Sequence, residues 1–243
     1  MALTAYVAAT QRLLQNPLPV TGSEYSTADL TTYINTARSW AAGEGRCVRD
    51  YSSLTLAAGT RTYAFSSITV SAAGVTAGIG SVLNIDALWV NVGAGQVWTQ
   101  TRPWPWFSLY HLNNPAPQQG QPTMWSQFGQ GVSGTLFVDP VPDQPYVAPV
   151  ATVCLPTALA DDSTAEALPY PWTDAVPFGA AYYALLSAQR EQDAELMLNR
   201  FKMFVAQARR VSNSDVVPNS YAQHPDMTLS NKLGLKSLPQ SGG

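Results

Sequence analysis

The sequence is short of charge, histidine and cysteine, and each shortage excludes a class of function. Charged residues make up 12% of its 243 residues, against about 25% in a typical soluble domain. The two cysteines, Cys47 and Cys154, lie far apart and form no CxxC pattern. This spacing excludes a small disulfide scaffold and a zinc site built from thiolates. We expect both cysteines to be buried free thiols.

The two histidines, His111 and His224, offer little material for a catalytic centre. Neither H-E-x-x-H nor G-x-S-x-G occurs in the sequence, so no zinc-protease helix and no nucleophile elbow is indicated. His224 lies in a polar stretch beside Pro225. We therefore expect no catalytic residues, no metal, no cofactor and no enzymatic activity.

Long hydrophobic runs and basic clusters are also missing. No stretch of 18 apolar residues occurs, so no transmembrane helix and no membrane association are expected. The first twenty residues lack the pattern of a secretory signal, which indicates synthesis in a host cytoplasm. The net charge of −3 argues against a protein that coats nucleic acid by neutralising phosphates. A slightly acidic charge suits the lining of a channel through which DNA passes without binding.

The pattern that is present begins with two helices. Apolar residues at three- and four-residue steps predict a helix over residues 4–15, which Asn16 and Pro17 end. The second helix follows Ser26, whose hydroxyl stands three residues ahead of Asp29 in a variant capping box. Glycines at positions 43 and 45 end it.

After Asp50 the apolar period changes from 3.6 to 2, which predicts strands. Two hairpins are expected, 54–56 with 62–65 and 85–92 with 96–101. A helical turn is expected over residues 107–112, and three further strands over 123–127, 134–138 and 147–155. The chain then becomes helical over 178–212, and we expect two antiparallel helices with the break near Gln192.

These elements predict an α+β fold: a helical bundle from the N- and C-terminal segments with an inserted antiparallel β region and an extended C-terminal tail. The expected parts are N-terminal helices over 1–50, a β-rich region over 51–160, a C-terminal helical hairpin over 161–212 and a tail arm over 213–243. The tail is rich in Pro, Ser and Asn and has no periodic pattern.

Several motifs have a chemical interpretation that their surroundings do not favour. Residues 129–134 (GQGVSG) satisfy G-x-G-x-x-G, but the residues that follow predict a strand where a dinucleotide site needs a helix. We interpret this motif as a hairpin tip. The acidic pair Asp161-Asp162 and the carboxylates Asp139 and Asp143 are typical of turns. The basic pair Arg209-Arg210 suits the end of the last helix.

The order of the features resembles the head-to-tail adaptor, or head-completion, proteins of tailed bacteriophages, especially short-tailed ones. The resemblance spans roughly residues 5–212. It rests on residues 33–37 (YINTA), on residues 136–143 (LFVDPVPD) followed by Tyr146, and on the final helix, which ends in Ala208-Arg209-Arg210.

The resemblance implies a non-enzymatic virion subunit. It implies a ring of twelve identical copies between the portal protein and the tail nozzle protein, through which double-stranded DNA passes. The C-terminal segment of such adaptors reaches the portal, so the resemblance assigns portal-binding roles to the apolar and aromatic residues of the tail, namely Tyr221, His224, Met227, Leu229, Leu233, Leu235 and Leu238.

Two alternatives stay open. The first is another virion tail or completion protein, which would share this composition. The second is a carbohydrate-binding module in which Trp104, Trp106 and Phe107 line a sugar site. Packing between the β region and the helices is the other use of this aromatic cluster.

Overall fold

The structure is a computed structural model that describes residues 2–15, 25–70, 77–112 and 117–211. The chain divides into two units, residues 1–205 and residues 206–243. Of the second unit, the structure describes residues 206–211, the end of a helix. The tail predicted over residues 213–243 lies outside the described residues.

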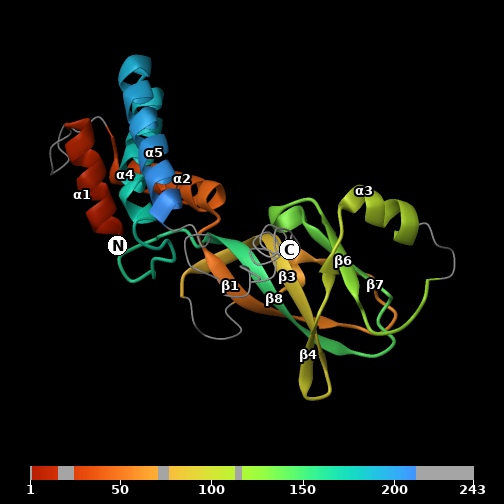
Figure 1. Ribbon diagram of the computed structural model, residues 1–243. Coiled ribbons are helices and arrows are strands. Elements are labelled where there is room, and N and C mark those ends of the chain that lie inside the picture. The colour runs from red at the N-terminus through yellow and green to blue at the C-terminus, as the bar shows by residue number, and fades with distance from the viewer. Residues whose placement is uncertain (1, 16–24, 71–76, 113–116, 212–243) are drawn as a thin grey trace, which may run out of the picture. The chain divides into compact units, whose positions relative to one another are not determined.

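Two helices, α1 (Leu3–Leu14) and α2 (Thr27–Gly45), begin the chain (Figure 1). Ser26 caps α2, because its hydroxyl accepts a hydrogen bond from the amide of Asp29 at 3.1 Å and satisfies a free donor at the helix start. The buried face of α2 repeats at three- and four-residue steps and includes Leu30, Ile34, Ala37 and Ala41. Both predicted N-terminal helices and the predicted cap are confirmed.

Two more helices, α4 (Val176–Ser187) and α5 (Glu191–Val211), follow the strands. The break between them falls at residues 188–190, close to the predicted position. The buried side chains of α4 are small, so neighbouring elements approach its backbone closely. A Cβ atom at Gly179 would lie 2.9 Å from the Cβ of Ala37 and 3.0 Å from the Phe201 ring.

The first sheet has the order β1-β8-β3-β4, and every pair in it is antiparallel. Its strands are β1 (Arg49–Leu56), β8 (Tyr146–Pro156), β3 (Ile79–Val92) and β4 (Gly95–Trp98). β3 and β4 form the second predicted hairpin as far as Trp98, whereas Gln100 and Thr101, predicted to continue it, form β5 in the second sheet. The inner face of this sheet buries Leu54, Leu88, Val90 and Val150.

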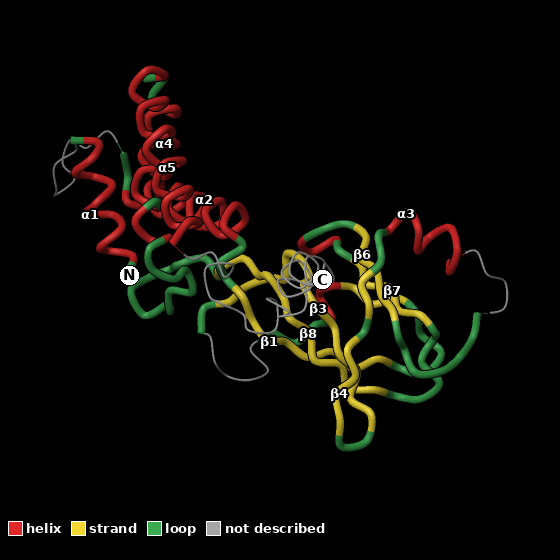
Figure 2. The backbone as a smooth tube through the Cα atoms, viewed as in Figure 1, coloured by secondary structure: helices red, strands yellow, loops and turns green. Residues whose placement is uncertain are grey.

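The second sheet has the order β2-β7-β6-β5, and its two central strands, β6 and β7, lie side by side (Figure 2). Its strands are β2 (Thr62–Ala64), β7 (Thr135–Asp139), β6 (Met124–Phe128) and β5 (Gln100–Thr101). A short helix, α3 (Trp104–Phe107), continues into a wider turn, η2 (Ser108–Leu112), between β5 and β6. The helical turn predicted over 107–112 is therefore confirmed.

The predicted bundle with one antiparallel insert is wrong. The described residues form a mixed α+β fold with five α-helices and two separate four-stranded sheets. One strand pair, β5 with β6, is parallel, and α3 lies within the β-rich part of the chain.

The first predicted hairpin is also wrong in its pairing. Both strands exist, and Gly59 has the positive φ of 74° that the turn between them requires. However, β1 pairs with β8 and β2 pairs with β7, so the two neighbours in sequence belong to different sheets. The amide of Gly59 donates to the carbonyl of Pro142, which ties this turn to the one before β8.

Candidate functional site

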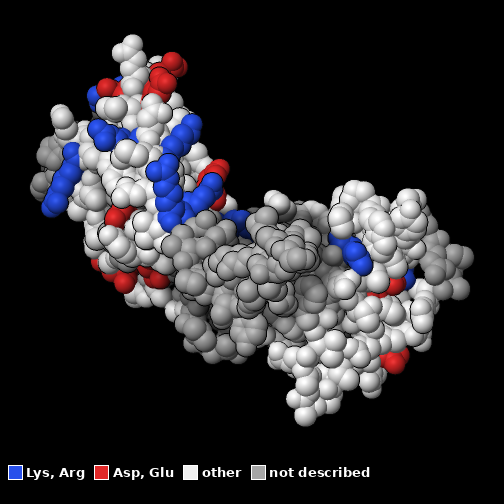
Figure 3. Space-filling view, in the orientation of Figure 1, with Lys and Arg blue, Asp and Glu red and all other residues white. Residues whose placement is uncertain are grey.

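The β-rich part of the chain, residues 51–156, is almost free of charge. It contains five charged side chains, Arg61, Asp86, Arg102, Asp139 and Asp143, of the 13 basic and 16 acidic residues in the whole sequence. In Figure 3, blue and red atoms gather over the helices, whereas the described atoms of the β-rich part are nearly all white.

Each of these five charges is engaged within the chain. Arg61 pairs with Asp139 at 2.8 Å, and Asp86 pairs with Arg46 at 2.5 Å. Arg102 lies over the Trp106 ring, 5.0 Å from its centroid. Asp143 accepts a hydrogen bond from the Tyr146 hydroxyl at 2.7 Å. The β-rich part therefore presents few charges to a partner.

Exposed apolar side chains concentrate in the same part. Of the fifteen large hydrophobic residues that are exposed among the described residues, ten lie between residues 51 and 156. They are Tyr51, Val92, Val97, Trp98, Trp106, Leu109, Tyr110, Phe128, Val132 and Val147. An uncharged surface with this many apolar groups is typical of a protein–protein contact.

One group of these residues lies on the outer face of the first sheet. Trp89 of β3 stands directly opposite Trp98 of β4, so both rings lie on the same face. The Tyr51 ring of β1 lies 5.5 Å from the Trp89 ring. Trp98 is 59% exposed and Tyr51 is 45% exposed. We call Tyr51, Trp89 and Trp98 the sheet surface.

A second group lies on α3 and η2. Leu109 and Tyr110 are each 62% exposed, and the Trp106 ring lies 5.3 Å from the Tyr110 ring. We call Trp106, Leu109 and Tyr110 the α3 surface. α3 and the tip of β4 project from different sides of the β-rich part (Figure 1).

Buried contacts hold the α3 surface in place. His111 Nδ1 lies 2.8 Å from Asp139 Oδ2, and the guanidinium of Arg61 donates both to Asp139 Oδ1 and to the carbonyl of His111, each at 2.8 Å. Phe107 is fully buried. The Trp104 ring packs between those of Phe128 and Phe137, at 4.8 and 4.7 Å. These contacts fix η2 on strand β7.

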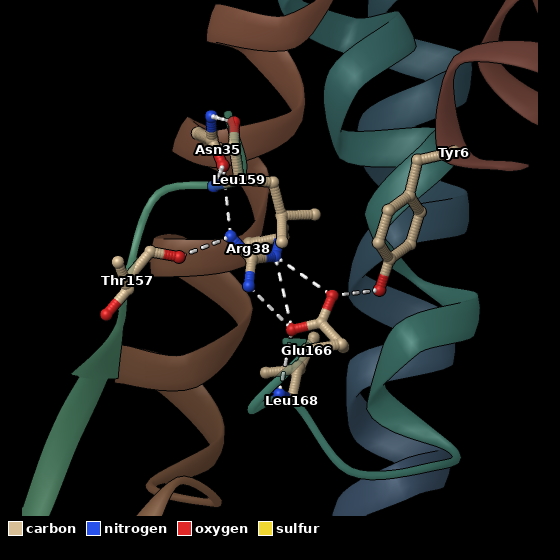
Figure 4. A network of polar contacts seen from close by, with 7 residues as sticks. All are labelled: Tyr6, Asn35, Arg38, Thr157, Leu159, Glu166 and Leu168. Atoms are coloured by element: carbon tan, nitrogen blue, oxygen red, sulfur yellow. Dashed lines mark hydrogen bonds and ion pairs between the residues drawn. The ribbon is translucent and has the colours of Figure 1, made fainter. Parts of the chain in front are cut away.

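A buried polar network fastens the chain segment after β8 to the helices (Figure 4). The guanidinium of Arg38 is fully buried and donates to both carboxylate oxygens of Glu166. Its Nη2 lies 2.6 Å from Oε1, and its Nε lies 3.0 Å from Oε2. Another of its nitrogens donates to the carbonyl of Thr157 at 2.8 Å. Asn35 and Leu159 exchange two hydrogen bonds, at 2.8 and 3.0 Å.

The network keeps Glu166 ionised. Burial by itself would raise the pKa of this carboxyl group, but hydrogen bonds from Arg38, from the Leu168 amide and from the Tyr6 hydroxyl lower its pKa below the ordinary value. Burial, together with the nearby carboxylate, raises the pKa of Tyr6. The network therefore positions chain segments and offers no free group for chemistry.

The motifs that sequence analysis discounted have structural roles here. Residues 129–134 form the tip of the hairpin between β6 and β7, as predicted. Asp161 accepts from Ser163 and Thr164 in a turn, and Asp162 accepts from the amide and hydroxyl of Thr4, at 2.8 and 2.7 Å. Asp139 is the exception, since it pairs with Arg61 and His111 across the fold.

The cysteines and the sugar-binding alternative can be placed as well. Cys47 and Cys154 are free, as predicted; Cys154 is buried, whereas Cys47 is half-buried. Trp104 packs against the rings of Phe128 and Phe137, whereas Trp106 lies against Arg102 and Tyr110 and remains 37% exposed. The packing of Trp104 favours a structural use of this residue.

The predicted portal-binding residues cannot be placed in the same way. Tyr221, His224, Met227, Leu229, Leu233, Leu235 and Leu238 all lie outside the described residues. Within the described ranges, no three His, Cys, Asp or Glu side chains gather closely enough to hold a metal ion. None of the helices in those ranges is long and apolar enough to cross a membrane.

Sequence reasoning missed the sheet surface and the Arg38–Glu166 pair. The sheet surface had a local signal, because Trp89 and Trp98 stand equally far from the turn at residues 93–94 and must face one another in a hairpin. Arg38 and Glu166 gave no signal, since charged side chains are usually exposed.

The arrangement suits a structural subunit, because the β-rich part presents an uncharged, apolar surface of a kind typical of protein–protein contacts. The sequence profile described as SU10 adaptor protein matches residues 1–224, so the chain belongs to the SU10 adaptor protein family, the head-to-tail adaptors of bacteriophages. No match to a curated protein was found. The chain is thus a structural adaptor of a phage and a component of the virion, and its family implies contact with portal and tail proteins.

Proposed function

We propose that twelve copies of this chain form a ring between the portal and the tail nozzle of a phage virion, and that the ring is a conduit for double-stranded DNA during ejection. The concentration of exposed apolar side chains in the nearly uncharged residues 51–156 supports this proposal best. Such a surface is costly in a free subunit and favourable in an assembly, where neighbouring subunits cover it.

The charge of the chain suits a conduit. The sequence has a net charge of −3, so a ring of many copies is acidic as a whole. Phosphates bind where basic side chains neutralise them. A wall with an acidic balance lets DNA pass without holding it, as a conduit must.

The tail is proposed as the portal-binding segment. Residues 213–243 have no periodic apolar pattern but contain scattered apolar residues, including Met227, Leu229, Leu233, Leu235 and Leu238. An extended segment that docks along a partner can cover a long stretch of its surface. A chain truncated after residue 212 should remain folded and should no longer join the portal.

Quantitative mass spectrometry of purified virus particles tests the ring. A ratio of this chain to the portal subunit near one to one is expected for a ring matched to the portal. Absence of the chain from particles, or a copy number far above that of the portal, would refute the proposal. Normal docking of the truncated chain would refute the assignment of the tail alone.

A further inference from the structure

We propose that the sheet surface of one copy docks on the α3 surface of the next copy. This inference rests on the proposed ring and names the two surfaces that build it. A ring needs two different, mutually complementary surfaces on each subunit, because the same head-to-tail contact repeats around it. The sheet surface, which includes Trp98 of β4, and the α3 surface are two such surfaces, and the tip of β4 and α3 lie on different sides of the β-rich part (Figure 1).

The two surfaces match in polarity. The sheet surface consists of Tyr51, Trp89 and Trp98, and the α3 surface consists of Trp106, Leu109 and Tyr110. Neither set contains a charged residue. Arg102 lies over the Trp106 ring, and apart from this contact the named residues offer a charged partner no opposite charge in return for the hydration it would lose. A second copy of this chain supplies an uncharged counterpart for each.

The available area suits a subunit contact. The exposed parts of the four rings Tyr51, Trp98, Trp106 and Tyr110 amount to about 400 Å², at roughly 200 Å² per ring. This aromatic area is about a quarter of the roughly 1,600 Å² that a standard interface buries in total.

The exposed edge of the first sheet also supports a contact between subunits. β4 is the outermost strand of its sheet, and all four of its residues are exposed. It contains no charged residue and no proline, the features that usually protect an exposed edge from pairing with another chain. An edge left unprotected beside exposed aromatic rings is suited to contact with a neighbouring subunit.

The α3 surface is rigid enough to serve as the other half of the contact. The bonds among Arg61, His111 and Asp139 and the burial of Phe107 fix the backbone beneath it. Leu109 and Tyr110 therefore project from a supported turn, and little backbone order has to be gained on docking.

Cross-linking within assembled virus particles tests the contact. The variant Trp98→Cys/Leu109→Cys, treated with a flexible bismaleimide, should give a ladder of covalent dimers, trimers and longer chains. Each single variant should stay monomeric on a denaturing gel, because a head-to-tail contact never brings two copies of one position together. The wild-type chain should also give no ladder, which controls for Cys47 and Cys154.

The pair Trp98→Cys/Tyr170→Cys is the matched control. Tyr170 is an aromatic residue that is 80% exposed and lies outside the β-rich part, so this pair should give no ladder. Dimers from a single variant would show a symmetric contact and overturn the inference. An equal ladder from the control pair, or no ladder from the test pair, would overturn it as well.

A charge insertion provides a second measurement that does not depend on cysteine chemistry. Trp98→Arg and Leu109→Arg should each reduce incorporation into particles at least tenfold, whereas Tyr170→Arg should leave it unchanged. In an equimolar mixture, the two defective variants should form one-to-one pairs that grow no further, because each retains one intact surface. Wild-type incorporation of either variant would overturn the inference while leaving the ring itself, measured by copy number, intact.

Discussion

Replacing Glu166 by glutamine should destabilise the fold strongly, although the side chain keeps its size. The carboxylate is the counter-charge for Arg38, whose side chain is fully buried, and the side chain of Glu166 is 7% exposed. Glu166→Gln leaves a buried guanidinium without an opposite charge. Breaking a buried pair in this way costs about 3–5 kcal/mol.

This free energy corresponds to a large change in melting temperature. For a chain of 150–250 residues, each kcal/mol lowers the melting temperature by roughly 2–4 °C, so Glu166→Gln should lower it by roughly 6–20 °C. Thermal melts followed by circular dichroism at pH 7 measure this shift. Asp193→Asn is the matched control, since Asp193 pairs with Arg190 but both side chains are about half exposed, and it should cost less than about 1 kcal/mol.

The double variant Arg38→Met/Glu166→Met separates the cost of an orphaned charge from the value of the pair. It removes both charges together, so its destabilisation should be smaller than the sum of the two single changes. A shift for Glu166→Gln as small as that for Asp193→Asn would refute the reasoning. It would mean that water reaches the Arg38 guanidinium.

Four further predictions concern pH, packing and reactivity. The pKa of Glu166 is lower in the folded chain than its ordinary value of 4.5. The ionised carboxylate therefore stabilises the fold above pH 4.5, and this stabilisation is lost as the pH falls through the lower pKa of the folded chain. The denaturant midpoint of the wild type should drop below pH 4.5, and that of Glu166→Gln should drop less. Gly134→Ala should destabilise by about 1–3 kcal/mol, because the new Cβ would lie 2.3 Å from the buried Phe65 ring; an unchanged urea midpoint would contradict this. Gln11→Met should stabilise by about 1 kcal/mol, since neither polar atom of the buried amide has a hydrogen-bond partner within the described part of the chain; a lower melting temperature would show that the amide is satisfied. Burial raises the pKa of Cys47 to about 12, so iodoacetamide should label the native chain at pH 8 far more slowly than the urea-unfolded chain, as mass spectrometry would show.

The Arg38–Glu166 pair illustrates why part of the structure could not be predicted. The two residues are 128 positions apart in the sequence, and neither stands in a recognisable motif. A glutamate in a polar loop and an arginine in an amphipathic helix are usually exposed. Their contact depends on where the segment after β8 crosses α2. The periodicity of the local sequence does not predict this crossing.

The sequence by itself determined the local elements. The stop predicted at Asn16 and Pro17 matched the end of the first helix at Leu14, Ser26 capped the second, and alternation marked the strands that became β3, β6, β7 and β8. Hairpins whose strands are joined by a short turn, such as β3 with β4, followed from the same pattern because their pairing is local. The order of these elements also supported the resemblance to phage adaptors, which the family match confirmed.

Only the tertiary structure decided which distant strands pair. A period of two shows which side of a strand is buried but not which strand lies beside it. β1 therefore could not be assigned to β8, nor β2 to β7, from alternation alone, and the hairpin expected between β1 and β2 was wrong. The outer face with Tyr51 beside Trp89 exists only because that long-range pairing brings β1, β8 and β3 into one sheet.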